Sequence, residues 1–321
     1  MASIEQLEHE AESLEQSGDL EAALQCWRQL AILKRNRYHL VNQGRVALEL
    51  GLLNEAEAAL QAAVQAAPTH AEAYFRLGLL YRRKPDLAAA LQSYRTGLEF
   101  EDDPVSRLLL AVTEDDLGFS TEARANFERV LAVEPGNDEA WFGLGLSLRF
   151  EDHERAMSCF RRAIEIDPRC SAAHRELGFR LWRKELLEEA EQSLKTAIEL
   201  DPSDAWAHSY LGRVYVSLQR FDDAEREFLR AADAWPERSF FHCELGELYE
   251  RTGRMREAET AFLTALSRES HDAHGNLKFG EFLRRQGRLE KAAAYLRRAV
   301  AADPTDDRPR KMLRDMGLDV S

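Results

Sequence analysis

The stretch that decides the fold is Ala205–Arg238, AWAHSYLGRVYVSLQRFDDAEREFLRAADAWPER. Its first half carries small or apolar residues at helical spacing, among them Leu211, Gly212 and Tyr215, which predicts one packed face of an amphipathic helix. A second apolar stripe follows, and Pro236 then ends the unit because proline cannot continue a helix interior. That second stripe consists of Phe221, Ala224, Phe228 and Ala231.

The stretch therefore predicts a helical hairpin that cannot stand alone. Two short helices bury too little apolar surface, so the hairpin needs stacked neighbours. We expect Gly212 and Ala224 to face each other, because residues without bulk let helix axes approach to about 8–10 Å. With Ala205 counted as position 1, the pattern recurs in nine units. They span 4–36, 37–70, 71–103, 104–137, 138–170, 171–204, 205–238, 239–272 and 273–306.

The recurring pattern resembles the tetratricopeptide repeat. The shared features are small residues at positions 8 and 20, an aromatic at 11, a large apolar residue at 24, alanine at 27 and proline at 32. The resemblance covers 4–306 and implies an all-α, right-handed superhelix, with first helices on the concave face and second helices outside. We expect one solenoid domain over 1–306. Residues 307–321 then form a C-terminal capping helix and tail, in which Met312, Leu313 and Met316 cover the last unit.

Two units depart from the pattern. The fourth has Glu114 at position 11, where an apolar residue is expected. The fifth has an internal turn, around Glu151–His153, that is one residue short. Such irregularities change the local superhelical twist, so we expect a bend or hinge in units four and five.

Composition narrows the class of partner. The net charge is −14 and the pI about 5.2, which disfavours nucleic acid and anionic membranes. We expect no membrane span, because no apolar run approaches 18 residues, and no secretory signal, because the start MASIEQLEHE is acidic. The four scattered cysteines predict reduced thiols in a cytoplasmic protein. The excess of arginine over lysine, 36 to 7, fits a GC-rich bacterial genome.

A second stripe on the first helices predicts a binding groove. Positions 2, 5, 9 and 12 lie about 130° from the packing face, with positions 6 and 13 beside them. In units three to seven this stripe combines arginines with large apolar side chains, which suit carboxylates and desolvated contacts. The predicted groove residues are Phe75, Arg76, Leu79, Arg82, Arg83, Phe142, Leu146, Arg149, Arg175, Phe179, Trp182, Arg183, Trp206, Tyr210 and Arg213. The alternative is that the aromatics at positions 5 and 9 only pack between repeats.

We predict no metal site, no cofactor and no catalysis. His174, His208 and His242 share position 4, but equivalent positions in successive repeats lie about 10 Å apart. One ion needs ligands at about 2 Å, so we interpret these histidines as residues of the core edge. The chain also lacks a glycine-rich phosphate loop and the GxSxG and HExxH motifs.

The predicted function is a cytoplasmic scaffold or adaptor, a monomer or weak homodimer. Its groove would bind an extended or helical protein segment that carries acidic and apolar residues. Two alternatives stay open. One is a self-associating structural protein, joined through Met312, Met316 or the outer faces. The other is a regulatory or sensor subunit of an enzyme complex, with a pocket closed by the turn at Glu151–His153.

Overall fold

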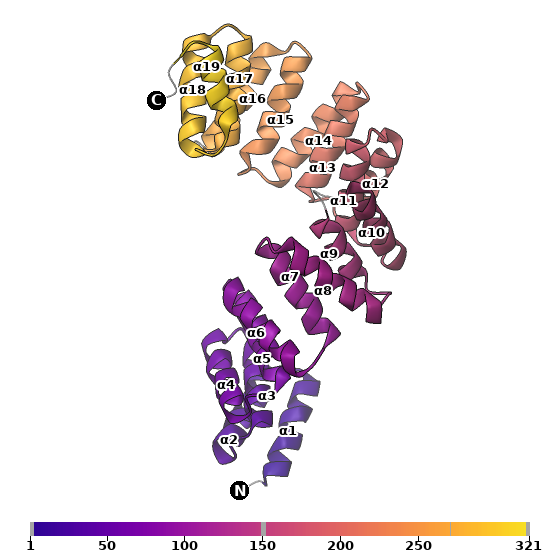
Figure 1. Ribbon diagram of the computed structural model, residues 1–321, viewed down its shortest axis with the longest axis vertical. Helices are drawn as coiled ribbons and strands as arrows, with labels where there is room; N and C mark the ends of the chain where they lie inside the picture. Colours follow the sequence, from indigo (N-terminus) through magenta and orange to yellow (C-terminus); the bar gives the residue numbers. More distant parts are fainter. Residues whose placement is uncertain (1–2, 149–151, 270, 319–321) are drawn as a thin grey trace. The chain divides into compact units, whose positions relative to one another are not determined.

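The computed structural model describes residues 3–148, 152–269 and 271–318, and within them every regular element is an α-helix (Figure 1). The all-α prediction is confirmed. The chain divides into two compact units, Met1–Ile166 and Asp167–Ser321. The first contains α1 (Ile4–Ser17), α2 (Leu20–Leu33), α3 (Arg37–Glu49), α4 (Leu53–Ala66), α5 (Ala71–Arg83), α6 (Leu87–Phe100), α7 (Pro104–Asp116), α8 (Ser120–Val133), α9 (Asp138–Ser147) and α10 (His153–Ile166). The second contains α11 (Ser171–Arg183), α12 (Leu187–Leu200), α13 (Ala205–Ser217), α14 (Phe221–Ala234), α15 (Ser239–Arg251), α16 (Met255–Arg268), α17 (Ala273–Arg285), α18 (Leu289–Ala302) and α19 (Asp307–Asp315).

Successive helices pair into hairpins, and in most of them a glycine at position 8 sets how closely the pair packs, while Ala11 and Ala111 hold that position in the first and fourth units. A β-carbon on Gly212 would lie 2.5 Å from Cε1 of Phe228 in the facing helix. In this hairpin the space left by the glycine is filled by the ring at position 24, as expected for a closely packed interior. In an equivalent hairpin, a β-carbon on Gly178 would also lie 3.3 Å from the carbonyl oxygen of Ala190 at position 20, and the pairing of Gly212 with Ala224 stays a prediction.

Most of the hairpin turns that the structure describes pass through a residue with positive φ at position 15. Gly253 and Gly287 hold this position with φ of 80° and 74°, which glycine adopts without strain. Glu185 and Gln219 hold the equivalent position with φ of 61° and 60°. A non-glycine residue pays a steric cost there.

Position 4 has the same structural role in several repeats. The donor side chain there bonds to the carbonyl of the proline six residues earlier, which closes the preceding repeat. Nε2 of His208 lies 3.1 Å from the Pro202 carbonyl, and Nε2 of His174 lies 3.1 Å from that of Pro168. Trp141 Nε1 donates in the same way to the Pro135 carbonyl, at 3.0 Å. This contact explains why histidine and tryptophan interchange at this position.

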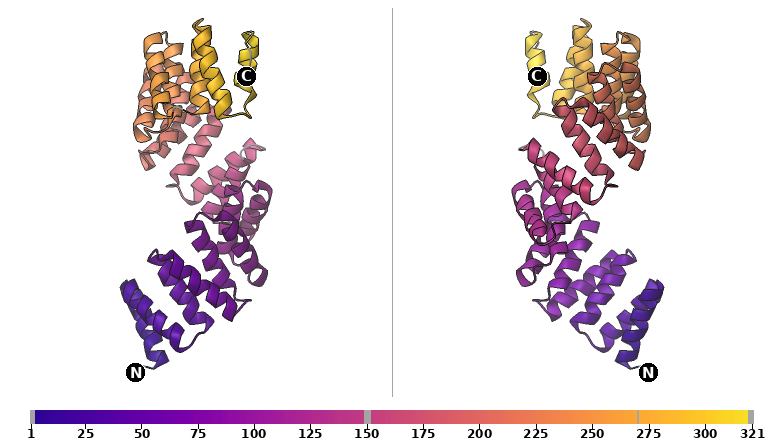
Figure 2. Two further views of the ribbon diagram at one scale, coloured as in Figure 1. Left: turned by 90° about the vertical axis from the view of Figure 1, so that its left-hand side faces the viewer. Right: turned by 90° about the vertical axis from the view of Figure 1, so that its right-hand side faces the viewer.

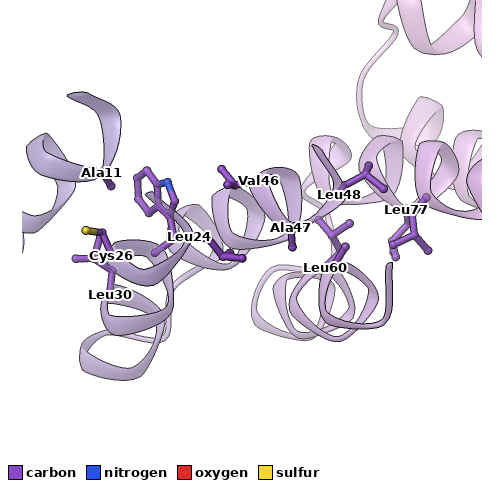
Figure 3. Packing of buried hydrophobic residues seen from close by; sticks show 12 residues of the cluster. Ala11, Leu24, Cys26, Leu30, Val46, Ala47, Leu48, Leu60 and Leu77 are labelled. Carbon is purple, nitrogen blue, oxygen red and sulfur yellow. The ribbon is translucent and has the colours of Figure 1, made fainter. Parts of the chain in front are cut away.

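An apolar core runs through helices α1 to α5 of the N-terminal unit (Figure 3). It extends from Ala11, beside α2, to Leu60 and Leu77 at the α4 and α5 end. Trp27 is 1% exposed within it, and its Nε1 donates to Glu15 at 2.6 Å. The tryptophan therefore buries its ring while its polar edge stays bonded.

A buried polar network accommodates Glu114, the residue by which the fourth unit departs from the repeat pattern. Glu114 of α7 is 2% exposed. Its Oε1 accepts from Arg95 at 2.9 Å and its Oε2 accepts from Asn126 at 2.7 Å. The Asn126 carbonyl oxygen accepts in turn from Arg107 at 2.9 Å. Because both carboxylate oxygens are bonded, position 11 here tolerates a buried charge in place of an apolar contact.

The last helix, α19, lies along α18, and both are drawn in yellow shades in Figure 2. Leu313 of α19 is fully buried, and Met312 and Met316 pack against the core that includes Leu277 and Leu296. The two methionines therefore contact their own chain. The assignment of nine repeats and a cap within 1–306 and 307–321 remains a proposal.

Candidate functional site

Aromatic rings join the first helices of the C-terminal unit, α11, α13, α15 and α17 (Figure 1). The Phe179 and Tyr210 ring centroids lie 4.6 Å apart, and those of Trp206 and Phe240 lie 5.1 Å apart. His274 continues the row, 5.3 Å from Phe240. Each contact links one first helix to the next, so these half-buried rings pack between neighbours.

Arg213 stands at the centre of this row. Its guanidinium carbon lies 5.4 Å from the Trp182 ring and 5.2 Å from the Phe240 ring. Its Nε donates to Oε1 of Glu244 at 2.5 Å, and Ser209 donates to the other carboxylate oxygen. Burial raises the pKa of Glu244, and Arg213 opposes that rise. The guanidinium of Arg213 therefore lies against aromatic rings, and its charge is already paired with a carboxylate of its own chain.

A hollow opens beside this pair, between the C-terminal halves of α13 and α15. It encloses about 460 Å³ and has Val216, Phe228 and Leu248 among its lining. The polar part of the wall consists of Trp182, Arg213, Ser217, Glu244, Glu247 and Arg251. We call this feature the α13–α15 hollow. It combines an apolar surface with charges of both signs, as small recessed binding sites commonly do.

Two side chains shape the rim of the hollow. Trp182 of α11 donates from Nε1 to Ser217 Oγ at 3.1 Å. The guanidinium carbon of Arg251 lies 5.5 Å from the Phe221 ring. Both contacts hold the rim residues in place before any ligand arrives.

The two predicted arginines of α11 differ in whether their charge is paired. Arg175 donates to Asp204 at 2.8 Å, so its charge is paired. Arg183 is exposed and has no acidic partner in the part of the chain that the structure describes. Of the two, only Arg183 keeps its guanidinium open to solvent.

In the N-terminal unit the predicted arginines contact neighbouring elements. Arg82 donates to Thr113 at 2.7 Å and lies 3.2 Å from Asp116, both on α7. Arg83 donates to the carbonyl of Leu48 on α3. Arg76 pairs with Glu72 one turn earlier, at 3.3 Å. The bonds of Arg82 and Arg83 join neighbouring first helices, whereas the Arg76 pair lies within α5, and a role of these arginines in binding stays a prediction.

The predicted apolar residues of the same unit pack into cores. Phe75 packs against the cluster of Ala90, Tyr94 and Leu110, and Leu79 packs against the α1–α5 core. The Phe142 ring lies 5.9 Å from that of Phe160, and Leu146 is half-buried. Arg149 lies outside the described residues, as does Glu151 of the irregular turn.

The glutamates along α1 form contacts inside the fold. Glu8 lies 2.6 Å from Nε2 of His39, and Glu12 accepts from Tyr38 at 2.8 Å. Glu15 accepts from Arg45 of α3 at 2.5 Å. The carboxylates of α1 therefore join it to the next first helix.

Our predicted set omitted several residues of the hollow. Glu244 stands at position 6, while Ser217 and Arg251 stand at position 13, the positions that flank the predicted stripe. Polar and charged residues at these flanking positions are therefore the signal in the sequence that could have identified the site. Phe228 was expected in the hairpin core, and the sequence pattern does not show that one edge of its ring borders an opening.

Within residues 3–148, 152–269 and 271–318, the structure shows neither a metal-binding cluster nor a membrane-spanning helix. Among them, no three histidine, cysteine, aspartate or glutamate side chains gather as a metal ion would require. Of the helices in residues 3–148, 152–269 and 271–318, none has the length and apolar character needed to cross a membrane.

Comparison with known families identifies the repeat. One tetratricopeptide repeat family model matches residues 10–71, 41–104, 108–169, 148–205 and 243–307, and a second matches 181–239. The chain belongs to the tetratricopeptide repeat family. This confirms the resemblance and, with the helix order, the solenoid class.

Two curated relatives share part of the tetratricopeptide repeat region. The peroxisomal targeting signal receptor of Yarrowia lipolytica (strain CLIB 122 / E 150) is 32% identical over 126 residues, 37% of this chain and 21% of the relative. The protein CTR9 homolog of Arabidopsis thaliana is 29% identical over 139 residues, 41% of this chain and 13% of the relative. The chain thus matches about a fifth or less of the length of each.

Solved tetratricopeptide repeat structures share the fold. A tetratricopeptide repeat protein from Parabacteroides merdae ATCC 43184 aligns with a TM-score of 0.65 at 17% identity, covering 76% of this chain and 98% of that one. PilW, a widely conserved type IV pilus biogenesis factor, aligns with a TM-score of 0.58 at 21% identity, covering 65% and 98%. At these identities the likeness shows the fold alone.

Proposed function

We propose that this chain is a scaffold that binds a segment of another protein on the first-helix face of its C-terminal unit. The α13–α15 hollow carries the proposal, because it joins an apolar surface to fixed charges in a recess of about 460 Å³. Tetratricopeptide repeat proteins are in general interaction scaffolds without catalysis. One relative is named a targeting signal receptor, which is a recognition role of the proposed kind.

The chemistry of the hollow favours a segment with both apolar and acidic residues. Val216, Phe228 and Leu248 provide an apolar surface, and aromatic and arginine side chains are the usual anchors of such contacts. The net charge of −14 argues against a nucleic acid as the default partner. We place the scaffold in the cytoplasm on the same composition, as a monomer or weak homodimer.

A paired substitution tests the proposal. Trp182→Ala with Arg183→Ala removes the indole from the rim and the adjacent open cation. The matched control is Trp235→Ala with Arg238→Ala, an arginine 5.8 Å from an exposed tryptophan at the opposite end of the α13–α14 hairpin. Proteins captured from native lysate by the wild-type chain should be lost with the first pair and kept with the control.

The outcome that contradicts the proposal is equally concrete. If quantitative proteomics finds every wild-type partner retained by the Trp182→Ala, Arg183→Ala variant, this face is not the binding site. Light scattering on the same samples separates binding from self-association. A stable oligomer that survives dilution would favour the structural alternative.

A further inference from the structure

The last turns of the first helices form a row of position-13 residues along the C-terminal unit. In chain order these are Arg183, Ser217, Arg251 and Arg285. Arg285 is occupied, because it donates twice to Glu250, at 2.7 Å for each bond. Arg183 and Arg251 are both exposed, and neither has an acidic partner among the described residues. Two exposed arginines without an acidic partner among the described residues therefore lie on α11 and α15, with Ser217 of α13 between them.

The other charges near the hollow compensate one another. Arg213 is paired with Glu244, and Glu247 lies 2.6 Å from Lys278. Arg251 is left as the uncompensated charge in the wall. Its guanidinium is held near the Phe221 ring at 5.5 Å, which orients the planar fork and lowers the entropy lost when it binds a carboxylate.

We propose that the α13–α15 hollow receives an acidic segment of a partner protein, whose two carboxylates bind Arg251 and Arg183 and whose apolar side chain between them rests against Trp182. This deepens the proposed function and depends on it. Neighbouring first helices pack about 10 Å apart, so arginines on alternate helices lie about 20 Å apart. An extended chain covers that distance in about six residues, which sets the spacing of the two acids.

Of the arginines that the sequence pattern indicates in this unit, the proposal uses Arg183 and adds Arg251, which the predicted set omitted. Arg175 and Arg213 already donate to Asp204 and Glu244, and a ligand carboxylate would have to displace these bonds. Arg183 and Arg251 exchange only water for the ligand. A charge-assisted bond formed this way is stronger than a neutral one.

The test uses the full chain and three synthetic probes. The first is a fluorescein-labelled twelve-residue peptide with two glutamates six residues apart and a phenylalanine midway between them. In the second peptide both glutamates are glutamines, and in the third the phenylalanine is alanine. Fluorescence anisotropy should show the first peptide binding about tenfold or more tightly than the second, and the binding should weaken as salt rises.

Protein variants assign the contacts. Arg251→Ala and Arg183→Ala should each weaken the acidic peptide about tenfold and leave the glutamine peptide unchanged. Arg251→Lys should fall between, because it keeps the charge and loses the fork. Arg238→Ala, which also removes an exposed arginine near an aromatic ring, is the matched control and should bind as the wild type does.

Three results would overturn the proposal. They are no binding of the acidic peptide at about 1 mM, equal binding of the acidic and glutamine peptides, and equal loss with Arg238→Ala. Stronger binding of a single-stranded oligonucleotide that depends on the same arginines would assign the site to a polyanion. Because the lysate capture depends on Trp182 as well, partners can be lost there while the acidic peptide shows no arginine dependence. In that case the scaffold function stands and the acidic-segment assignment fails.

Discussion

At the scale of single residues, position 15 of each repeat shows how backbone geometry constrains the sequence. The helix ends in a left-handed turn there, closed by two bonds to the preceding carbonyls. In the α13–α14 turn the Gln219 amide donates to the Val216 carbonyl at 3.2 Å and the Arg220 amide donates to the Tyr215 carbonyl at 2.8 Å. This is the geometry in which glycine usually ends a helix, and Gln219 holds it at φ 60°.

We expect Gln219→Gly to stabilise the protein. Relief of the left-handed conformation gains about 1–2 kcal/mol, and the extra freedom of glycine in the unfolded chain returns about 0.5–1 kcal/mol. The net gain should therefore be about 0.5–1 kcal/mol in the free energy of unfolding, measured by urea titration. Gly253→Ala, at φ 80°, is the reverse experiment and should destabilise by about 1 kcal/mol. A loss of stability in Gln219→Gly would show that its side chain matters more than its backbone.

At the scale of elements, neighbouring hairpins are joined by a repeated polar contact. A glutamate at position 21 of one repeat accepts from position 11 and position 16 of the next. Glu225 accepts from the Tyr249 hydroxyl at 2.8 Å and from Arg254 at 2.5 Å. The Arg254 guanidinium carbon also lies 4.3 Å from the Tyr249 ring. Because the contact links α14 to both α15 and the start of α16, it fixes how one hairpin sits on the next.

The pH dependence of this contact follows from the direction of the pKa shift. Hydrogen bonds from Arg254 hold the pKa of Glu225 below its ordinary value. The folded state therefore gains stability from the ionised carboxylate above the ordinary pKa, and loses it as the pH falls through the lowered pKa. Glu225→Gln should cost about 0.5–1 kcal/mol at pH 7, and the difference from wild type should vanish once the pH has fallen through the lowered pKa of Glu225. Urea titrations at several pH values measure it.

A matched substitution separates the tyrosine from the arginine. Glu259 accepts from Arg288 at 2.8 Å, and position 11 of the following repeat is Leu283. Glu259→Gln should therefore cost less at pH 7 than Glu225→Gln. An equal cost for both would mean that the tyrosine hydroxyl contributes nothing.

At the scale of the whole molecule, the division into Met1–Ile166 and Asp167–Ser321 has consequences for stability. In repeat proteins each hairpin contacts its neighbours only, so stability is close to a sum of local terms. The C-terminal unit contains the complete α13–α15 hollow and is closed at one end by α19, whose Leu313 is fully buried.

We expect residues 167–321 to fold when expressed alone. Circular dichroism should show a helical protein with a cooperative urea transition, and the fragment should bind the same partners as the full chain. Residues 1–166, prepared in parallel, should fold and lack this binding. An unstructured 167–321 fragment would show that its stability depends on the preceding repeats.

The local pattern determined the hairpins, their order and their family. Helical spacing of apolar residues, glycine at position 8 and proline at position 32 depend on contacts within one or two helices, so each could be predicted from nearby residues. The pattern also placed Trp182, Arg213 and Arg183 on one face of the first helices, since a helix repeats every 3.6 residues.

Tertiary structure alone decided which charged groups are open and where the surface is recessed. Arg175 and Arg213 lie on the same predicted face as Arg183, yet each pairs with an acid about 30 residues away: Arg175 with Asp204, which caps α13, and Arg213 with Glu244 of α15. Glu114 departs from the repeat pattern in the sequence, and only the folded structure shows that Arg95 and Asn126 donate hydrogen bonds to its carboxylate. A hydrogen bond depends on a few tenths of an ångström between side chains of different helices, and that distance is set by how the hairpins stack, which no local spacing in the sequence records.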